Sequence, residues 1–189
     1  MQQSEEKVKG MLNGVDVERL TATIDAIKEQ PEIAKFKYRA VNRWGTGGNN
    51  RTILNEYSGA CQRFNRRIPF VLQIDESPIL FGNDMGPNPA EYALAALAGC
   101  LTTSIVYLAS AQGIRIDEVE STCEGDVNLH GSFGMDETVR SGYESVRITF
   151  KVKGAASDEK LQELVELAQK RSPLFDIFTN KVPVSVRLG

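Results

Sequence analysis

The segment NPAEYALAALAGCLTTS, residues 88–104, decides the fold because it predicts one long apolar helix that carries a single cysteine, Cys100. Asn88 is a favoured N-cap residue, and Pro89 is favoured at the first helical position. Gly113 can supply the left-handed residue that follows the end of many helices. We therefore expect a helix that begins at Pro89 and ends just before Gly113.

No charged residue occurs between Tyr92 and Ile114, so this helix needs cover on more than one side. Helical spacing puts small or weakly polar residues on the face of Cys100, and apolar residues such as Leu94 and Ile105 on the opposite face. The run is long enough to cross a bilayer. Its Ala, Thr, Ser and Gly content instead favours a core helix covered by a sheet or by a second subunit.

The composition of the 189-residue chain is that of a globular protein with one sizeable core, since 41% of the residues are hydrophobic and 25% are charged. The net charge of −3 leads us to expect no basic stripe interleaved with aromatic residues, and no nucleic-acid partner. The polar N-terminus lacks the pattern of a secretory signal. We expect a cytoplasmic protein that does not bind membranes.

The chain before the long helix predicts a short helix followed by strands. Apolar residues at helical spacing from Val17 to Ile27 predict an amphipathic helix, within an N-terminal extension over residues 1–33. Alternation in residues 34–44, the GTGGNN turn and the RTILNEY segment predict a hairpin, and Ile68–Ile74 predicts a third strand. Residues 75–89 are rich in Pro, Gly, Asn and Asp and predict a long loop.

The chain after the long helix predicts two more strands, a helix and a last strand. Residues 114–131 and 143–152 show the alternation of strands with one wet face. Ser157 caps a helix over residues 158–171, and VPVSVRL, residues 182–188, predicts the last strand. This order of elements predicts an α+β fold, with residues 34–189 as its domain.

The three cysteines, Cys61, Cys100 and Cys123, lack the spacing of a zinc site, and their odd number predicts at least one free thiol. Cys123 falls on the apolar side of an alternating strand, as a packing residue does. Spacing alone also explains Cys100 as a small core residue, and Cys61 is unassigned. A solvated turn explains His130, the only histidine, better than a Cys/His dyad does.

Three segments together resemble the OsmC/Ohr family. They are GPNPAEYALAALAGCLTTS, residues 86–104, EGDVNLHG, residues 124–131, and RSPLFDIFTNKVPVSV, residues 171–186. The resemblance extends from about Lys35 to the C-terminus. It implies an intertwined homodimer in which antiparallel sheets wrap around long central helices, with two sites at the subunit boundary.

The resemblance also implies a thiol reaction. In characterised family members a helix cysteine attacks a peroxide, and a second cysteine before a C-terminal proline resolves the product as a disulfide. Cys100 matches the first position, whereas Ser172 stands at the second, so the usual disulfide cannot form. Ser172 followed by Pro173 is also a favoured pair at the start of a short helix.

A third site residue implied by the resemblance is an arginine. Arg51 in GGNNRT matches it most nearly, ahead of Arg43 and Arg39. The other interpretation of Arg51 is a solvated charge in a hairpin. If the resemblance holds, the guanidinium would stabilise the thiolate of Cys100 and the developing oxyanion.

The family's carboxylate lies ten positions before the helix cysteine, where this chain has Ala90, and the neighbouring acid is Glu91. Nine residues of straight helix span about 13.5 Å and two and a half turns, so Glu91 cannot touch Cys100 within one unbroken helix. Glu91 could act through a helix break, through Arg51 or from another subunit. Otherwise it favours the positive N-terminus of the helix.

We therefore expect that Cys100 reduces organic or inorganic hydroperoxides in a cytoplasmic homodimer that protects against oxidative or osmotic stress. The chain has no metal, flavin or nucleotide signature, so we expect no bound cofactor and an external thiol or dithiol reductant. RRIPFVL, residues 66–72, and SPILFG, residues 77–82, would contact an alkyl group. The alternative is a non-catalytic protein that binds a small apolar ligand, and a cysteine hydrolase that uses His130 is a third hypothesis.

Overall fold

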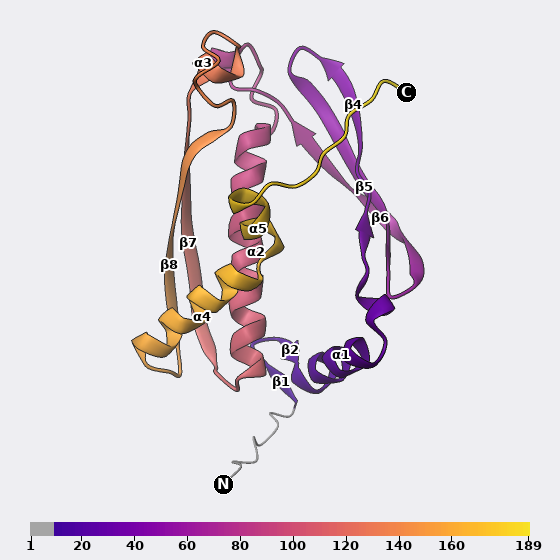
Figure 1. Ribbon diagram of the computed structural model, residues 1–189, viewed down its shortest axis with the longest axis vertical. Coiled ribbons are helices and arrows are strands. Elements are labelled where there is room, and N and C mark those ends of the chain that lie inside the picture. Colours follow the sequence, from indigo (N-terminus) through magenta and orange to yellow (C-terminus); the bar gives the residue numbers. More distant parts are fainter. Residues whose placement is uncertain (1–9) are drawn as a thin grey trace. The chain divides into compact units, whose positions relative to one another are not determined.

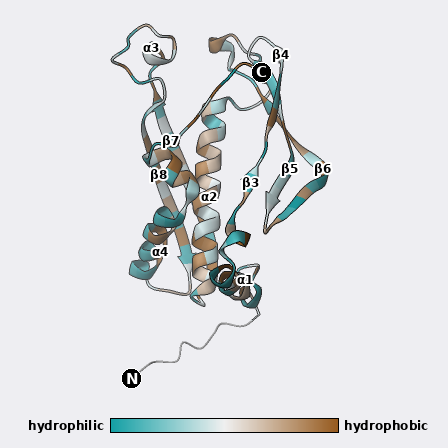
Figure 2. Ribbon diagram, turned by 45° about the vertical axis from the view of Figure 1, so that its right-hand side comes forward, coloured by the Kyte–Doolittle hydropathy of each residue, from teal (hydrophilic) through white to brown (hydrophobic). Residues whose placement is uncertain are grey.

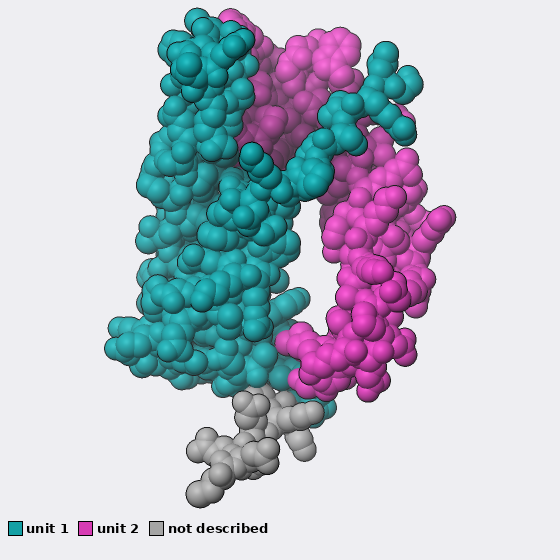
Figure 3. Space-filling view, in the orientation of Figure 1, with its two compact units in different colours: residues 1–18, 94–189 teal, residues 19–93 magenta. Residues whose placement is uncertain are grey.

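The computed structural model describes residues 10–189, which form two compact units (Figures 1 and 3). Of these residues, 10–18 and 94–189 belong to unit 1, and 19–93 belong to unit 2. The unit boundaries lie inside helices α1 (Val17–Glu29) and α2 (Pro89–Ala111). The boundary predicted between residues 33 and 34 coincides with neither and stays a prediction. Residues 1–9 of the predicted extension lie outside the described residues.

Unit 2 is built around an antiparallel sheet. β5 (Asn49–Gly59) and β6 (Gln62–Ile74) form a long hairpin. β3 (Lys37–Tyr38) and β4 (Val41–Thr46) both pair with β5. The predicted hairpin and third strand are thus confirmed, although β6 begins before Ile68 because its first residues are polar and gave no apolar alternation. Two 3-10 helices, η1 (Pro31–Ala34) and η2 (Pro78–Leu80), complete the unit.

Unit 1 contains a second antiparallel sheet and most of the helices (Figure 1). Its two strands are β7 (Ile116–Val127) and β8 (Tyr143–Gly154), joined through the short helix α3 (Leu129–Ser132). Helices α4 (Asp158–Arg171) and α5 (Pro173–Thr179) follow β8. Helices together with antiparallel sheets confirm the predicted α+β fold.

The predicted alternation of β7 is confirmed along most of the strand. Ser121, Cys123 and Gly125 are partly buried, whereas Glu120 and Glu124 are exposed. Val127 was expected on the inner face but is 41% exposed. The reason is that the pairing of β7 with β8 shifts between Asp126 and Val127, which breaks the alternation.

The core of unit 1 lies along one stripe of α2. Leu97, Leu101, Ile105 and Ala109 recur every four residues and are at most 2% exposed. Ala109 packs against Leu161 and Leu164 of α4, and side chains from the ends of β7 and β8 surround this cluster. Each buried leucine or isoleucine contributes about 1.5–3 kcal/mol through removal of its side chain from water.

The other faces of α2 are apolar or weakly polar but remain exposed within one chain. Gly99, Thr103 and Tyr107 are exposed, and the helix is pale to brown along its length in Figure 2. By length and composition α2 could cross a membrane, a test that core helices of soluble proteins also pass. The sequence predicted cover on more than one side of α2, and the single chain covers one side.

A short hairpin fastens the C-terminal end of α2. It is formed by β1 (Met11–Leu12) and β2 (Val15–Asp16), with Asn13 in its turn. The Asn13 amide donates to the Ile114 carbonyl at 2.9 Å and accepts from the Ile116 N–H at 2.8 Å. Asn13 also donates to the buried Ser110 hydroxyl at 3.1 Å. One asparagine thereby satisfies the backbone where α2 turns into β7.

The prediction of a last strand over residues 182–188 is wrong for the single chain. Residues 181–189 form no strand, and Val184, Val186 and Leu188 are 81%, 93% and 101% exposed. The segment alternates as a strand does, but no other strand among residues 10–189 pairs with it. Alternation specifies which face is apolar, whereas a strand exists only where its backbone finds an edge to bond to.

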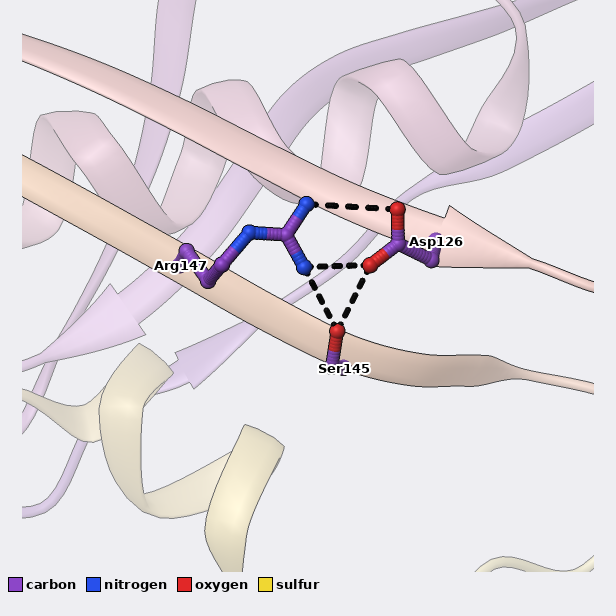
Figure 4. Close-up of polar contacts among 3 residues, drawn as sticks. All are labelled: Asp126, Ser145 and Arg147. Carbon is purple, nitrogen blue, oxygen red and sulfur yellow. Dashed lines mark hydrogen bonds and ion pairs between the residues drawn. The ribbon is translucent and has the colours of Figure 1, made fainter.

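Charged side chains bridge the exposed face of the β7–β8 sheet. Figure 4 shows the guanidinium of Arg147 on β8 facing the carboxylate of Asp126 on β7, with Ser145 beside both. The Ser145 hydroxyl donates to Asp126 at 2.7 Å. The hydrogen bonds from Arg147 and then Ser145 lower the pKa of Asp126 to about 2.

We predict that Arg147→Gln raises the pKa of Asp126 toward its ordinary value of 3.8. Because the folded-state pKa is lowered, the stabilisation is present above the unfolded value and is lost as the pH falls from about 4 to 2. A carboxyl carbon NMR titration measures the pKa directly. Arg115→Gln, which removes the partner of Asp117 instead, is the control. An unchanged Asp126 pKa in Arg147→Gln would contradict the interpretation.

Candidate functional site

Cys100 and Ser172 are brought together although 72 residues separate them in the chain. The hydroxyl of Ser172 donates a hydrogen bond to the sulfur of Cys100, with 3.1 Å between Oγ and Sγ. Ser172 is 2% exposed, and Cys100 is partly buried. The sequence resemblance paired these two positions as those of two reacting cysteines, and in this chain the pair is a thiol and a hydroxyl.

Ser172 is fixed because it ends one helix and begins the next. Its N–H donates to the Gln169 carbonyl as the C-cap of α4, and its hydroxyl accepts from the Phe175 N–H at 3.1 Å as the N-cap of α5. Pro173 takes the first helical position of α5, as the sequence predicted. The predicted capping role of Ser172 is therefore confirmed, and the same geometry aims the hydroxyl at Cys100.

The hydroxyl of Ser172 is well suited to favour a negatively charged sulfur. It donates its hydrogen to Sγ while its oxygen accepts an N–H, and a donor that also accepts is polarised toward stronger donation. Hydrogen bonds to a charged partner are worth about 1.5–3 kcal/mol, more than those between neutral groups. The thiolate is the reactive form of cysteine, so this contact bears on reactivity as well as on packing.

Within unit 1, the side of α2 that carries Gly99, next to Cys100, is open. The preceding residue is Gly99, and a Cβ added there would meet no atom within 4 Å. Gly99 and Thr103 are exposed on the same side of the helix, whereas Leu97 and Leu101 form the buried stripe. The partly buried Cys100 therefore lies between the buried stripe and an open side of the helix within unit 1.

Arg51, the predicted cation, lies in unit 2 on β5, in line with Arg43 on β4 and Gln73 on β6. It is exposed, and its Nε donates to the Gln73 side-chain oxygen at 2.8 Å. Arg43 and Arg51 also line a hollow of about 480 Å³, together with Trp44 and Ile53. Arg51 thus stands on an ordered sheet, and its role toward Cys100 stays a prediction.

Glu91, the predicted carboxylate, forms a capping box at the start of α2. Its carboxylate accepts from the Asn88 N–H, and the Asn88 side chain accepts from the Glu91 N–H, both at 2.8 Å. The predicted N-cap at Asn88 is confirmed by this pair. α2 has no break between Pro89 and Ala111, so the helix break that would bring Glu91 toward Cys100 is absent.

Sequence reasoning missed the buried carboxylate of Asp75, which holds the loop before α2. Asp75 is 1% exposed and accepts from the backbone N–H groups of Glu76, Asn83 and Met85 at 2.9, 3.3 and 3.3 Å. Burial raises the pKa of this carboxyl, but the hydrogen bonds together outweigh burial and lower it. Gly82 completes the turn, since a Cβ there would lie 1.8 Å from the Glu76 carbonyl. An acid at the junction of a strand and a Gly- and Asn-rich loop was the available signal.

The remaining candidates form no hydrogen bond with Cys100 or Ser172 among residues 10–189. Cys61 is exposed in the two-residue turn between β5 and β6, and burial raises the pKa of Cys123 on β7. His130 is exposed on α3, where its ring lies 3.0 Å from the Asn128 side-chain oxygen. Over residues 10–189, no three His, Cys, Asp or Glu side chains are grouped to hold a metal ion.

Comparison with known proteins places these features in a family. The family model for OsmC-like proteins matches residues 82–187, more than half of the chain. This region includes α2, Cys100 and Ser172. No curated protein sequence matches the chain significantly.

Solved structures with a similar fold have low sequence identity to this chain. An OsmC-like protein from Mycoplasma pneumoniae is 16% identical, with a TM-score of 0.57 over 75% of this chain and 86% of that one. An OsmC-like protein of unknown function from Vibrio cholerae is 12% identical, with a TM-score of 0.56 over 75% and 92%. An organic hydroperoxide resistance protein OsmC from Legionella pneumophila is 18% identical, with a TM-score of 0.50 over 75% and 90%. These matches establish a shared fold.

We predict that Ser172→Ala slows alkylation of Cys100 at neutral pH by roughly tenfold, because the sulfur loses a donor worth about 1.5 kcal/mol to a charged partner. The rate is measured with iodoacetamide followed by mass spectrometry of the Cys100 peptide. Ser157→Ala is the matched control, since Ser157 caps α4 in the same way and has no contact with Cys100. Both variants lose about 1 kcal/mol of helix capping, so equal rates in the two would rule out a role for the Ser172 hydroxyl.

Proposed function

The chain belongs to the OsmC-like protein family, and from that premise we propose that it reduces hydroperoxides through the single thiolate of Cys100. The observation that carries this proposal is the hydrogen bond from the buried Ser172 hydroxyl to the Cys100 sulfur. A hydroxyl aimed at a partly exposed helix thiol favours the thiolate.

The proposed reaction begins when the Cys100 thiolate attacks the terminal oxygen of a hydroperoxide. A sulfur–oxygen bond forms as the oxygen–oxygen bond breaks, and the leaving alkoxide or hydroxide takes a proton to become an alcohol or water. Cys100 is then a sulfenic acid. A dithiol reductant condenses with the sulfenic acid, releases water, and in a second exchange returns Cys100 to the thiol while it becomes a disulfide itself.

Arg51 is the cation that we assign to this reaction. A guanidinium stabilises both a thiolate and the oxyanion that develops as the peroxide bond breaks. Its ordered position on β5 and the lack of an acidic partner among the described residues leave its charge available. The apolar side chains Ile68, Phe70, Ile79 and Phe81 of the same unit are 78%, 59%, 85% and 89% exposed, and we propose them as contacts for an alkyl group.

Serine at position 172 makes the proposed enzyme dependent on an outside thiol. A hydroxyl cannot condense with a sulfenic acid to a disulfide, so the adjacent residue supports the thiolate without resolving its oxidised form. Of the other two cysteines, Cys61 is in the β5–β6 turn and Cys123 is on β7, and both are free thiols in the structure. We therefore propose a one-cysteine cycle in the cytoplasm, without a bound cofactor.

We also propose that the functional form is a homodimer. Three features of residues 10–189 support a partner copy. They are the exposed apolar side of α2, a β7–β8 sheet whose outer edges no other described strand covers, and the C-terminal segment, residues 181–189, which pairs with no described strand. Two-stranded sheets are marginally stable alone, and exposed edges invite pairing. A second copy would supply both cover and strands.

A second candidate function is non-catalytic binding of a small apolar ligand. The Ser172 substitution supports it, because the chain lacks the usual second thiol of the family. In this role the Cys100–Ser172 contact would be a packing and capping feature, and the exposed apolar side chains of unit 2 would form the binding surface. The peroxide experiment separates the two candidates.

We predict that one equivalent of an organic hydroperoxide adds one oxygen to Cys100 and produces no rapid internal disulfide. The sulfenic acid should react with a dimedone-type reagent, return to the thiol with added dithiol, and become sulfinic acid under excess peroxide. Intact-mass and peptide mass spectrometry check each step. Arg51→Ala should slow the oxidation without unfolding the protein.

The control for this experiment is Cys100→Ser, which should gain no oxygen at low peroxide. A fast disulfide from Cys100 to Cys61 or Cys123 would show that the chain has a substitute resolving thiol. An unreactive Cys100 in a folded protein would reject the peroxidase proposal and favour the binding role.

We predict that the protein is a dimer at micromolar concentration in light scattering coupled to size-exclusion chromatography. Val184→Lys together with Val186→Lys should weaken the dimer, because two charges would replace the apolar side of residues 181–189. Lys181→Ala and Arg187→Ala, on the polar positions of the same segment, are the controls. A stable monomer in the wild-type protein would contradict the proposal.

A further inference from the structure

The sheet of unit 2 concentrates positive charge to a degree that the whole-chain charge conceals. Residues 35–74 contain eight Lys or Arg and a single acid, Glu56, although the chain as a whole has a net charge of −3. The expectation that no basic stripe interleaved with aromatic residues occurs is therefore wrong. Acidic residues in other segments of the chain offset these cations in the net charge.

Strand pairing separates Lys37 and Arg63 from the row of aromatic rings, whereas Arg66 lies over the rings of Tyr57 and Phe70, at 5.0 and 5.1 Å from their centroids. Tyr38, Tyr57 and Phe64 face one another across β3, β5 and β6 and stack, with ring centroids 6.3 and 4.8 Å apart. The adjacent row consists of Lys37, Ser58 and Arg63, which are also direct cross-strand partners. Because side chains alternate along a strand, the two rows lie on opposite faces of the sheet.

The row of Lys37, Ser58 and Arg63 presents an ammonium, a hydroxyl and a guanidinium side by side. Directly opposed residues have Cβ atoms about 4.5–5.5 Å apart, close enough for all three to reach one small ligand. Within residues 10–189, Lys37 and Arg63 form no ion pair. Two cations two strands apart with no acid between them repel each other unless an anion joins them.

A hollow of about 420 Å³ lies over this row. Its lining adds Arg39, Glu56 and Asn65 to the three donors, along with Tyr57 and Phe64. Glu56 is engaged by Arg39, with 3.1 Å between Oε2 and Nη1. The ionised groups of the hollow therefore sum to a charge of about +2, which matches a phosphate monoester at neutral pH.

We propose that the hollow over Lys37, Ser58 and Arg63 binds the phosphate group of a small organic phosphate. The Arg63 guanidinium offers a planar fork for two phosphate oxygens, the Lys37 ammonium a point charge, and the Ser58 hydroxyl a neutral donor between them. Asn65, which lines the same hollow, would contact the organic part of the ligand. The volume exceeds that of a phosphate ion and falls in the range of small-molecule sites.

A free small phosphate is favoured over a nucleic-acid strand by the arrangement of the rings. Proteins that hold single strands stack bases on aromatic side chains beside the cations. Here the ring row occupies the other face of the sheet, and Arg66 already lies over its Tyr57 ring. A chain of phosphates bound over Lys37 and Arg63 would therefore have no stacking platform next to it. The two free cations also suit one phosphate group rather than a row of them.

Pyrophosphate is the first probe, titrated calorimetrically into the full-length protein at low ionic strength. We expect binding that weakens by about tenfold or more in Lys37→Gln with Arg63→Gln, because two charge-assisted contacts are removed. Ser58→Ala should weaken it less. Lys35→Gln is the control, since it removes one positive charge two residues before Lys37. The Lys35 ammonium is already paired with Glu32 at 2.8 Å. Peroxide reactivity of Cys100 should be unchanged in all three variants, which separates this site from the proposed reaction.

Further binding measurements identify the source of the phosphate group and show which results would overturn the proposal. A nucleoside monophosphate should bind at the same residues, seen as NMR shifts confined to the row and the lining of the hollow. Binding to vesicles with anionic phospholipid or to a single-stranded oligonucleotide, without binding of pyrophosphate, would overturn the proposal. An equal loss in Lys35→Gln, or no binding of pyrophosphate at millimolar concentration, would overturn it as well.

Discussion

The architecture depends on the need to cover α2, a helix of 23 residues without a charged residue after Glu91. One chain covers a single stripe of it, in which Leu97, Leu101 and Ile105 are almost completely inaccessible to water. The apolar surface that remains is the physical reason to expect a second copy, because exposed apolar area costs free energy in proportion to its size. The outer edges of β7 and β8, which no strand among residues 10–189 covers, have the same need, since backbone groups at a sheet edge lack partners.

Ser172 connects the helical scaffold to the thiol. It satisfies the last turn of α4 and the first turn of α5, and its remaining hydrogen points at Cys100. A residue that caps two helices has little freedom to move, so the donor is held in place by the fold and not by the sulfur. At this position the sequence resemblance implied a second thiol, and the chain instead holds a hydroxyl that donates to the Cys100 sulfur.

Charge in this protein is organised locally. On the β7–β8 sheet, acids and bases face each other across the strands, and the contacts of Arg147 and Lys151 lower the pKa values of Asp126 and Glu118. On the unit 2 sheet, the cations have one acid among them. The first arrangement is self-neutralising and stabilises strand pairing, whereas the second leaves charge available to a ligand.

The sequence alone determined the ends of α2, the capping by Asn88 and Ser172, the hairpin of unit 2 and the α+β class, because each depends on residues close together in the chain. The OsmC-like motifs also led to Cys100 and Ser172 before their contact was known. Only the tertiary structure decided that the two touch, that Asp75 is buried in a ring of N–H donors, and that residues 182–188 have no strand to join. These outcomes depend on which distant segments meet, and local spacing carries no information about an edge, a donor or a charge supplied from elsewhere in the fold.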